Sequence, residues 1–329
     1  MAADGLTRPQ LAVDFPAIEA ASVRIRGQAV VTPLLEYSDL NQRAGARVLL
    51  KAESLQVGGA FKFRGAYNRL AALSAEERAK GVVAASTGNH AQGVAHAAKR
   101  LGMTATIVMP VDAPKIKLEN TRNLGAEVIT YDRKTQDRDT IAKALAAERG
   151  CAFVHPYDNP WVMAGQGTIG IEMVEQAGVP LDDVLICCGG GGLTAGIATA
   201  VKHLSPQTRI YAVEPEGYDD TVKSLQAGQR LFIEKGALSI CDAISTNAPG
   251  ELTFPVLQHC GVEGIAVTDD DARDAMRYAF HTLKLVLEPG GAVALGAILS
   301  GKFRAEGRVV AVVLSGGNVD PSLFAQIIS

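Results

Sequence analysis

Residues 82–109 read VVAASTGNHAQGVAHAAKRLGMTATIVM, and this stretch decides the fold class. It begins with a short apolar run, Val82 to Ala85, which is typical of a buried strand. The segment from Ala91 to Arg100 is rich in alanine and ends before Gly102, as a helix closed by a glycine does. A second apolar run follows from Thr104 to Met109. The pattern predicts two parallel strands joined by a helix, the repeating unit of an α/β fold.

The same alternation continues along the chain in both directions. After Met109 we expect helices over Ile116–Leu124 and Arg138–Arg149, and strands over Glu127–Tyr131 and Cys151–Val154. A second α/β region has expected strands at Val184–Cys188, Arg209–Val213 and Arg308–Leu314, and expected helices at 193–203, 270–286 and 291–299. The prediction is an α/β protein of two parallel-sheet, three-layer lobes with the active site between them. Residues 1–80 with 159–329 are expected to form the large domain, and residues 81–158 the small one.

Composition excludes several classes of function. The 329 residues carry 32 Lys and Arg against 35 Asp and Glu, a net charge of -3, so neither a nucleic acid nor a membrane surface is an expected partner. The N-terminal residues lack the basic and then apolar pattern of a signal peptide, and no apolar run approaches the length of a membrane span. The five cysteines are odd in number and form no CxxC pair. We therefore expect a soluble, cytoplasmic protein.

Lys62 is the strongest candidate for a reactive group. It lies in the run Gly58-Gly-Ala-Phe-Lys-Phe-Arg-Gly65, directly after a predicted strand at Arg47–Lys51. Apolar surroundings disfavour a charged ammonium, so they lower the lysine pKa and make available the neutral amine that forms a Schiff base. The alternative is a lysine at the mouth of a helix, with its stem packed and its ammonium in water.

A second candidate site is the run of four glycines from Gly189 to Gly192, which joins a predicted strand to a predicted helix. Glycines allow close approach of a ligand, and unpaired N–H groups at a helix start bind anions, so a phosphate fits this place. The alternative is a tight turn. No Lys-Ser continuation follows and no GxGxxG spacing is present, so neither a Walker A loop nor a dinucleotide fingerprint is predicted.

Two further segments follow predicted strands. Ser86-Thr-Gly-Asn-His90 again directs N–H groups toward one point, where a carboxylate is the expected guest, although an ordinary helix N-cap explains it too. Ser315-Gly-Gly-Asn318 ends the last predicted strand, where a hydroxyl needs a partner; a plain turn is the alternative.

In this order along the chain, the segments at residues 60–62, 86–90, 189–192 and 315–318 resemble the pyridoxal-phosphate-dependent serine/threonine dehydratase and serine racemase family of fold type II, whose fold is similar to the tryptophan synthase β subunit. The resemblance implies that the large domain binds pyridoxal 5'-phosphate. It further implies a Schiff base at Lys62, Phe61 beside the cofactor ring, Asn89 at the ring oxygen, the phosphate at Gly189, Gly190, Gly191, Gly192 and Leu193, and Ser315 at the pyridine nitrogen.

The resemblance also implies a reaction. Lys62 would remove the Cα proton of an amino acid whose carboxylate is held by Ser86, Thr87, Gly88, Asn89 and His90. A neutral Ser315 leaves the pyridine nitrogen unprotonated and weakens the electron sink, which favours β-elimination over transamination. The expected products are an imine, then an oxo acid and ammonia. Racemase-type relatives have a serine at Thr87, whose hydroxyl would act on the opposite face, so racemisation of serine or aspartate stays an alternative.

Arg138 bears on the substrate. The serine racemase pattern also has an arginine at this place, where a planar guanidinium can bind a second carboxylate. That would make 3-hydroxyaspartate the favoured substrate and the protein a 3-hydroxyaspartate dehydratase. The alternative is a surface arginine between Asp137 and Asp139, which would leave L-threonine or L-serine as the substrate.

Glu214, Tyr218 and Asp220 match the spacing at which relatives bind Mg²⁺, or Ca²⁺ or Mn²⁺ in its place, through two carboxylates and a backbone carbonyl. A solvated acidic loop is the alternative. The expected partners are a small amino acid and further copies of the chain in a dimer or tetramer. A rival of another class is a nucleotide-binding or regulatory protein that uses Gly189–Gly192 without covalent chemistry.

Overall fold

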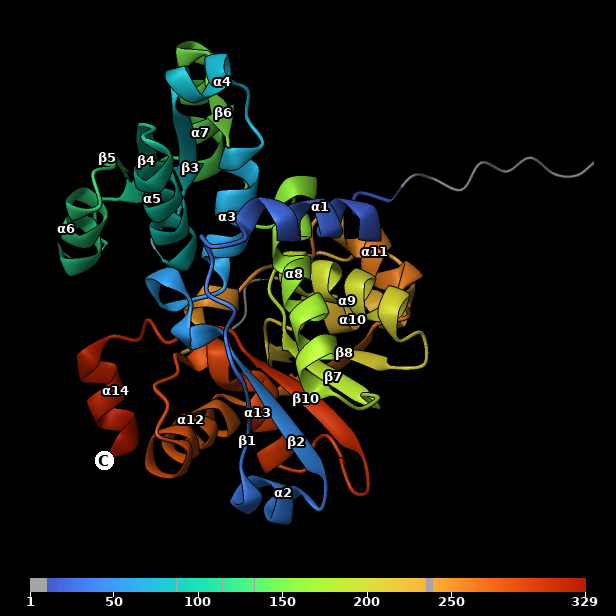
Figure 1. Cartoon of the computed structure of the whole chain (residues 1–329). Coiled ribbons are helices and arrows are strands. Elements are labelled where there is room, and N and C mark those ends of the chain that lie inside the picture. Colours follow the sequence, from blue (N-terminus) through green and yellow to red (C-terminus); the bar gives the residue numbers. More distant parts are fainter. Residues whose placement is uncertain (1–10, 87, 114, 133, 235–238) are drawn as a thin grey trace, which may run out of the picture.

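The computed structural model describes residues 11–86, 88–113, 115–132, 134–234 and 239–329. In this part of the chain, two β-sheets form two lobes, and the smaller lobe stands above the larger in Figure 1. None of the described helices is long and apolar enough to cross a membrane. The predicted fold class, two lobes built on parallel sheets, is therefore confirmed.

The larger sheet, in spatial order, consists of β1 (Leu34–Glu36), β2 (Arg47–Ala52), β10 (Val309–Leu314), β7 (Asp183–Cys187), β8 (Arg209–Pro215) and β9 (Glu263–Val267). Only β1 is antiparallel to its neighbour among these described strands. The smaller, fully parallel sheet consists of β5 (Glu127–Tyr131), β4 (Ala105–Pro110), β3 (Val82–Ala85) and β6 (Ala152–Phe153). The carboxyl ends of parallel strands meet at one edge of a sheet, which is where ligands bind in such folds.

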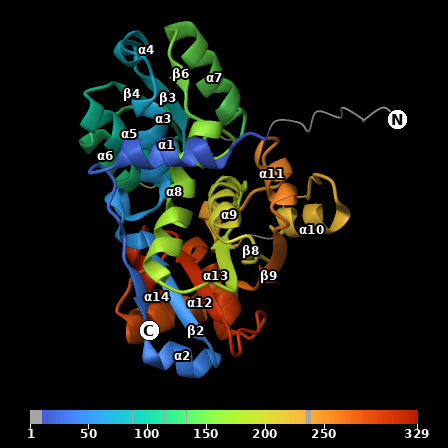
Figure 2. The ribbon, with the colours of Figure 1, turned by 45° about the vertical axis from the view of Figure 1, so that its right-hand side comes forward.

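The helices of the larger lobe are α1 (Phe15–Ile25), α2 (Ser38–Ala44), α8 (Pro160–Ala177), α9 (Gly192–Leu204), α10 (Asp220–Ala227), α11 (Thr253–His259), α12 (Asp269–Tyr278), α13 (Pro289–Leu299) and α14 (Pro321–Ile328). Its short helical turns are η1 (Glu53–Leu55), η2 (Val57–Gly59), η3 (Asp242–Ile244) and the π-helical η4 (Ala279–Leu283). Around the smaller sheet in Figure 1 lie α3 (Lys62–Ala71), α4 (Ala75–Lys80), α5 (Asn89–Leu101), α6 (Lys115–Asn123) and α7 (Arg138–Arg149). Figures 1 and 2 show α8 and α9 on one side of the larger sheet and α12 and α13 on the other.

Alternation along β3 shows how the smaller sheet is covered on both faces. Val82 and Ala84 belong to the core that includes α3 and α5, whereas Val83 and Ala85 pack with Ala142 of α7. Successive side chains of a strand point to opposite faces, so one four-residue strand supplies both cores. This double burial explains why the sequence of β3 is apolar throughout.

Helix α3 is fixed where the two lobes meet. A Cβ atom on Gly165 of α8 would lie 2.7 Å from the carbonyl oxygen of Arg64, so the glycine is needed for α8 to approach α3. The buried Arg64 side chain forms ion pairs with Glu53 of η1 at 2.8 Å and with Glu172 of α8 at 2.6 Å. Both contacts hold the first turn of α3, and therefore Lys62, against the larger lobe.

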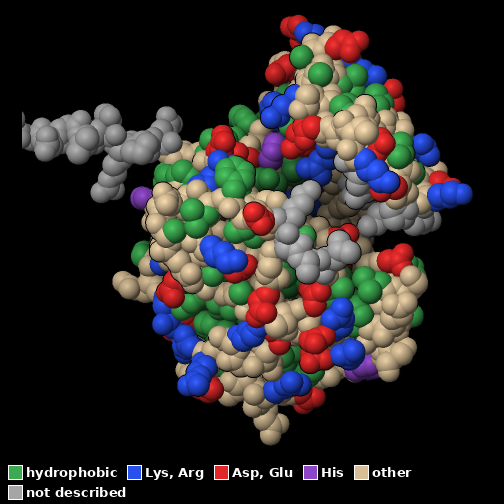
Figure 3. Space-filling view, turned by 180° about the vertical axis from the view of Figure 1, so that it is seen from behind, with side chains coloured by type: hydrophobic (Ala, Val, Ile, Leu, Met, Phe, Trp, Pro, Cys, Tyr) green, Lys and Arg blue, Asp and Glu red, His purple; other side chains and the backbone are tan. Residues whose placement is uncertain are grey.

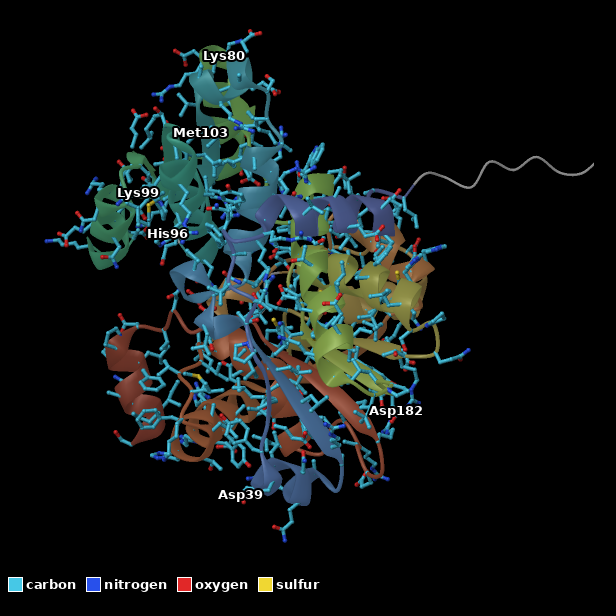
Figure 4. All side chains as sticks on the ribbon, in the orientation of Figure 1. Asp39, Lys80, His96, Lys99, Met103 and Asp182 are labelled. Carbon is cyan, nitrogen blue, oxygen red and sulfur yellow. The ribbon has the colours of Figure 1, made fainter. Side chains whose placement is uncertain are left out.

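A contact on the opposite side of the α3 entry involves α5. His96, labelled on α5 in Figure 4, lies beside η2, where Gly58 has a φ of 74°. A Cβ atom on Gly58 would be 3.1 Å from the His96 ring. The backbone before Lys62 thus needs glycine both for its left-handed conformation and for space.

Several element boundaries differ from the expected ones by one or two residues, and one differs by more. The helix expected over residues 270–286 ends earlier, because α12 passes into η4 and Lys284 takes a φ of 60°. A left-handed residue closes a helix by satisfying its last carbonyl groups, and the N–H of Leu285 bonds to the carbonyl of Ala279 here. The predicted domain limits at residues 80 and 158 stay a prediction.

Candidate active site

A cavity of about 250 Å³ lies between the lobes, at the carboxyl ends of β3, β7 and β10. Figure 3 shows the molecular surface hollowed between the upper lobe and the body. The described lining brings together these residues that the sequence singled out: Phe61, Lys62, Ser86, Gly88, Asn89, His90, Arg138, Gly189, Gly190, Gly191, Gly192, Leu193 and Ser315. Thr87 lies outside the described residues. Glu214, Tyr218 and Asp220 are not part of the lining.

Lys62 is the first residue of α3, and its amine points into the cavity wall. Its Nζ atom donates to the carbonyl of Pro156 at 2.7 Å and lies 5.0 Å from the centre of the Phe61 ring. Burial lowers the pKa of Lys62 to about 8, because desolvation disfavours the ammonium. More of the side chain is therefore neutral near pH 7 than in an ordinary lysine, and the neutral amine is the form that a nucleophile or a base requires.

The backbone before Lys62 is tied to the end of β10. The N–H of Phe61 donates to the carbonyl of Ser315 at 3.0 Å, and Ala60 forms an isolated β-bridge with Gly316. Ser315 itself is 3 % exposed and lines the cavity. These bonds bring the predicted amine and the predicted hydroxyl, distant in sequence, to one site.

The four glycines form the turn into α9, and we call this turn the glycine cradle. Gly191 has a φ of 88°, and a Cβ atom would lie 2.2 Å from the Tyr157 ring on Gly190 and 2.7 Å from the Tyr157 carbonyl oxygen on Gly192, so three of the four positions require glycine. No side chain of the described residues caps α9, which leaves the N–H groups of its first turn open. The buried Thr194 hydroxyl beside them has no hydrogen-bond partner in the described part of the chain. Open donors of this kind fit a phosphate.

The segment after β3 offers a similar but smaller cradle. Helix α5 begins at Asn89 without a side-chain cap, and the Ser86 hydroxyl accepts the N–H of Gly88 at 3.1 Å. The His90 ring is tied to the carbonyl of Val154 at 2.9 Å, and burial lowers its pKa to about 3. His90 is therefore neutral, so a carboxylate here would meet backbone N–H groups and not a charged imidazole.

The cavity also has residues that were not singled out from the sequence, among them Glu288, Cys187 and Tyr157. Glu288, at the start of α13, accepts a hydrogen bond from Asn89 Nδ2 at 2.6 Å. The thiol of Cys187 lies near Lys62 and Ser315, and burial raises its pKa to about 12, so it stays protonated. Tyr157 covers the glycines. Glu288 precedes Pro-Gly-Gly, a sequence typical of the start of a helix. The sequence therefore predicts a helix start at Glu288 and gives no sign that its side chain lines a cavity.

Asn89 is held from both sides. Its Oδ1 atom accepts a bond at 2.8 Å from Asn318, whose Nδ2 atom also donates to the carbonyl of Gly58 at 2.7 Å. Together with the bond to Glu288, these contacts fix the Asn89 amide in one orientation. One Nδ2 hydrogen of Asn89 remains for a ligand, since an amide carries two.

Arg138 begins α7 and borders the cavity from the smaller lobe. Its Nε atom lies 3.1 Å from Asp139 Oδ1, and its side chain is 41 % exposed. An ion pair this exposed is weak, so the guanidinium can exchange Asp139 for a carboxylate in the cavity. The arginine lies at the mouth of the site and faces solvent as well.

The acidic pair predicted to bind a metal lies behind the cavity wall. Glu214 accepts the N–H groups of Thr221 at 3.3 Å and Val222 at 2.9 Å, and Asp220 accepts the hydroxyl of Thr246, a cavity residue, at 3.2 Å. Burial raises the pKa of Glu214 well above its ordinary value and that of Asp220 to about 7.

Neither carboxylate forms an ion pair within the described part of the chain, and two buried carboxylates suit a hard divalent cation, so the donor set fits. The described residues contain no cluster of three or more His, Cys, Asp and Glu side chains that could hold a metal. The predicted third ligand is the carbonyl of Tyr218, which such a cluster would not include.

Comparison with known proteins gives consistent matches. The family model described as pyridoxal-phosphate dependent enzyme matches residues 25–316. L-threo-3-hydroxyaspartate ammonia-lyase from Pseudomonas sp is 41 % identical over 97 % of this chain and 99 % of the relative. The Saccharomyces cerevisiae protein of that name is 42 % identical over 94 % of each. The structure of maize serine racemase superposes with a TM-score of 0.91, at 36 % identity and 96 % coverage of each chain.

Proposed function

Because the chain belongs to the family of pyridoxal-phosphate-dependent enzymes, we propose that it is an ammonia-lyase that acts on 3-hydroxyaspartate. The observation that carries this proposal is that one cavity is lined by a lysine with a lowered pKa and by an arginine at its mouth. The 3-hydroxyaspartate ammonia-lyases among the relatives support it. Release of oxo acid and ammonia from 3-hydroxyaspartate tests it, with aspartate, which lacks the hydroxyl, as the control.

The residues present fit pyridoxal phosphate. Lys62 would attach it, the open N–H groups of Gly189–Gly192 and the unpartnered Thr194 hydroxyl would bind its phosphate, and Asn89 and Ser315 would contact its ring. When bound, the cofactor supplies an electron sink that lowers the barrier to removing the Cα proton. Phe61 and Ser315 are uncharged, so neither would hold the pyridine nitrogen in its protonated form. A weaker sink of this kind favours loss of a β-leaving group over transamination.

The chain's own residues have separate tasks. The N–H groups at the start of α5 would bind the α-carboxylate, and Arg138 would bind the distal carboxylate. These two contacts orient the Cα–H bond toward the Lys62 amine, which accepts the proton. General base catalysis of this kind contributes about 10²–10⁴-fold in rate.

The alternative functions would use the same cavity, either with another substrate or with racemisation in place of elimination. L-Threonine and L-serine would use the Lys62 chemistry without the second contact to Arg138. A racemase activity would require an acid on the opposite face, and the residue proposed for it, Thr87, lies outside the described residues. The likeness to maize serine racemase keeps that activity as the second candidate.

Location and assembly are part of the proposal. The five cysteines are free thiols, and four of them are buried, which suits a reducing compartment such as the cytoplasm. We propose a homo-oligomer, a dimer or tetramer, as the working form. Sedimentation of the purified protein measures this directly.

We further propose that Glu214, the Tyr218 carbonyl and Asp220 bind Mg²⁺ or a similar cation. Adding MgCl₂ to chelator-treated protein should raise the melting temperature by roughly 5 °C, since binding at 100 times Kd contributes about 2.7 kcal/mol. Asp220→Asn should abolish this rise, because the amide removes one of the two negative charges.

Glu216→Gln is the matched control for the cation prediction. Glu216 lies two residues from Glu214, but its exposed carboxylate pairs with Lys302 at 2.8 Å. This variant should keep the full response to magnesium. An unchanged response in Asp220→Asn would show that the cation binds elsewhere.

A further inference from the structure

The turn of residues 155–158 connects β6 of the smaller lobe to α8 of the larger lobe. His155 holds this turn, since its Nδ1 atom accepts the N–H of Asp158 at 2.8 Å and that of Tyr157 at 3.4 Å. An Nδ1 atom that accepts must be unprotonated, and burial lowers the pKa of His155 accordingly. Hydrogen bonds within the turn therefore fix its conformation, in addition to the bonds that it forms with other segments.

Pro156 of this turn contacts Lys62, and Tyr157 covers the glycine cradle. The carbonyl of Pro156 accepts the Lys62 amine at 2.7 Å. A Cβ atom on Gly192 would lie 2.7 Å from the carbonyl oxygen of Tyr157, and one on Gly190 would overlap its ring. The turn therefore spans the distance between the amine and the glycines.

Asp158 anchors the turn to a third segment. Its carboxylate accepts the N–H groups of residues 251–253 at 3.1, 2.8 and 3.2 Å, where α11 begins without a cap of its own. The same segment binds the carbonyl of Gly190 through the N–H of Gly250 at 3.1 Å and the Thr253 hydroxyl at 2.7 Å. Asp158 is thereby linked to both the lysine side and the glycine side of the cavity.

We propose that Asp158 is a positioning residue that sets the separation between Lys62 and the glycine cradle, and thereby between the two attachment points of the cofactor. Asp158 does not line the cavity, so it acts through Pro156, Tyr157 and residues 250–253. The inference rests on the proposed placement of pyridoxal phosphate between Lys62 and Gly189–Gly192. It concerns retention of the cofactor and not the choice of substrate.

The test measures how fast the holoenzyme loses pyridoxal phosphate after dilution, followed by visible absorbance without substrate. Asp158→Ala removes an acceptor of three N–H groups and should speed the loss by about tenfold, which lies within the range of effects measured for removal of a helix cap. Asp158→Asn keeps the Oδ1 acceptor that Leu252 and Thr253 share, so it should stay within about threefold of the wild type.

Asp320→Ala is the matched control, because Asp320 accepts the N–H groups of Ser322 at 2.8 Å and Leu323 at 3.2 Å at the start of α14. Asp320 does not line the cavity. This variant should lower the melting temperature by an amount similar to Asp158→Ala and leave the rate of cofactor loss unchanged. Equal acceleration in both variants, or none in Asp158→Ala, would overturn the proposal.

If Asp158→Ala does not fold, the same measurement of cofactor loss on Asp158→Glu tests the proposal. The Asp158 carboxylate packs so closely on the Gly250 backbone that even a Cβ atom there would lie 2.3 Å from Oδ1, so the additional methylene of a glutamate should displace the carboxylate from these N–H groups. Cofactor loss faster than in Asp320→Ala supports the proposal, and a rate equal to that of the wild type or of Asp320→Ala contradicts it. Because no substrate is present, the result stands even if 3-hydroxyaspartate proves to be the wrong substrate.

Discussion

Lys62→Ala is expected to abolish the visible absorbance of the purified protein and to lower kcat by about 10²–10⁴-fold or more. The alanine removes both the attachment point of the cofactor and the amine that accepts the Cα proton. The lowered pKa of Lys62 and its place in the cavity wall are the physical reasons. Absorbance spectra and initial rates of oxo-acid release measure the two effects.

Lys302→Ala serves as the comparison for this variant, because Lys302 pairs with Glu216 and Asp271 at the surface. It should keep the absorbance and the rate of the wild type. Borohydride reduction of the wild type, followed by peptide mapping, locates the attached lysine independently. A reduced cofactor adduct on any lysine other than Lys62 would refute the assignment.

Arg138→Ala is expected to lower kcat/KM for 3-hydroxyaspartate by roughly 30-fold or more and to spare serine and threonine. Truncating one partner of a guanidinium–carboxylate pair costs on the order of 2–5 kcal/mol when the bound pair excludes water. Because Arg138 is 41 % exposed in the unliganded protein, we take the lower end of this range, which corresponds to roughly 30-fold. Serine and threonine have no second carboxylate, so they lose nothing. Arg138→Lys should recover only part of the loss, because an ammonium lacks the planar fork of donors.

Arg149→Ala is the matched control on the same helix. Arg149 ends α7 and pairs with Glu127, away from the cavity. It should leave the ratio of kcat/KM values unchanged. Equal losses on all substrates in Arg138→Ala would indicate a structural role for Arg138, and no loss on any of them would place it in solvent.

The sequence predicted the smaller lobe well, because its segments are short and clearly separated. The limits of β3, β5 and α7 agree with the expected ones, since glycines, helix caps and short apolar runs mark these segments. The fold class and the family are confirmed as well. In this part of the chain, the local sequence was sufficient to predict where strands and helices begin and end.

Helix α8 and strand β9 were not expected. α8 is buried on most sides and rich in glycine, so it shows no polar face and no amphipathic period. Gly165, for example, serves contact with α3, which only the tertiary structure reveals. β9 is a five-residue strand with one buried position, too weak a pattern to stand out.

Some residues of the candidate site could be predicted from the local sequence, and others could not. Lys62, Gly189–Gly192 and Ser315 could be predicted because each follows a strand in a distinctive local run. Glu288, Tyr157 and Asp158 could not, because they gain a place near the cavity only through contacts between distant segments. The roles of all these residues stay predictions until the variants are measured.

The most direct test of the central claim is kcat/KM for oxo-acid release from the four stereoisomers of 3-hydroxyaspartate, compared with serine and threonine. The account predicts that at least one hydroxyaspartate isomer exceeds both monocarboxylates by roughly 30-fold or more, the contribution assigned to Arg138. Equal or higher values for threonine or serine would contradict it, and the second carboxylate would then have no part in substrate choice.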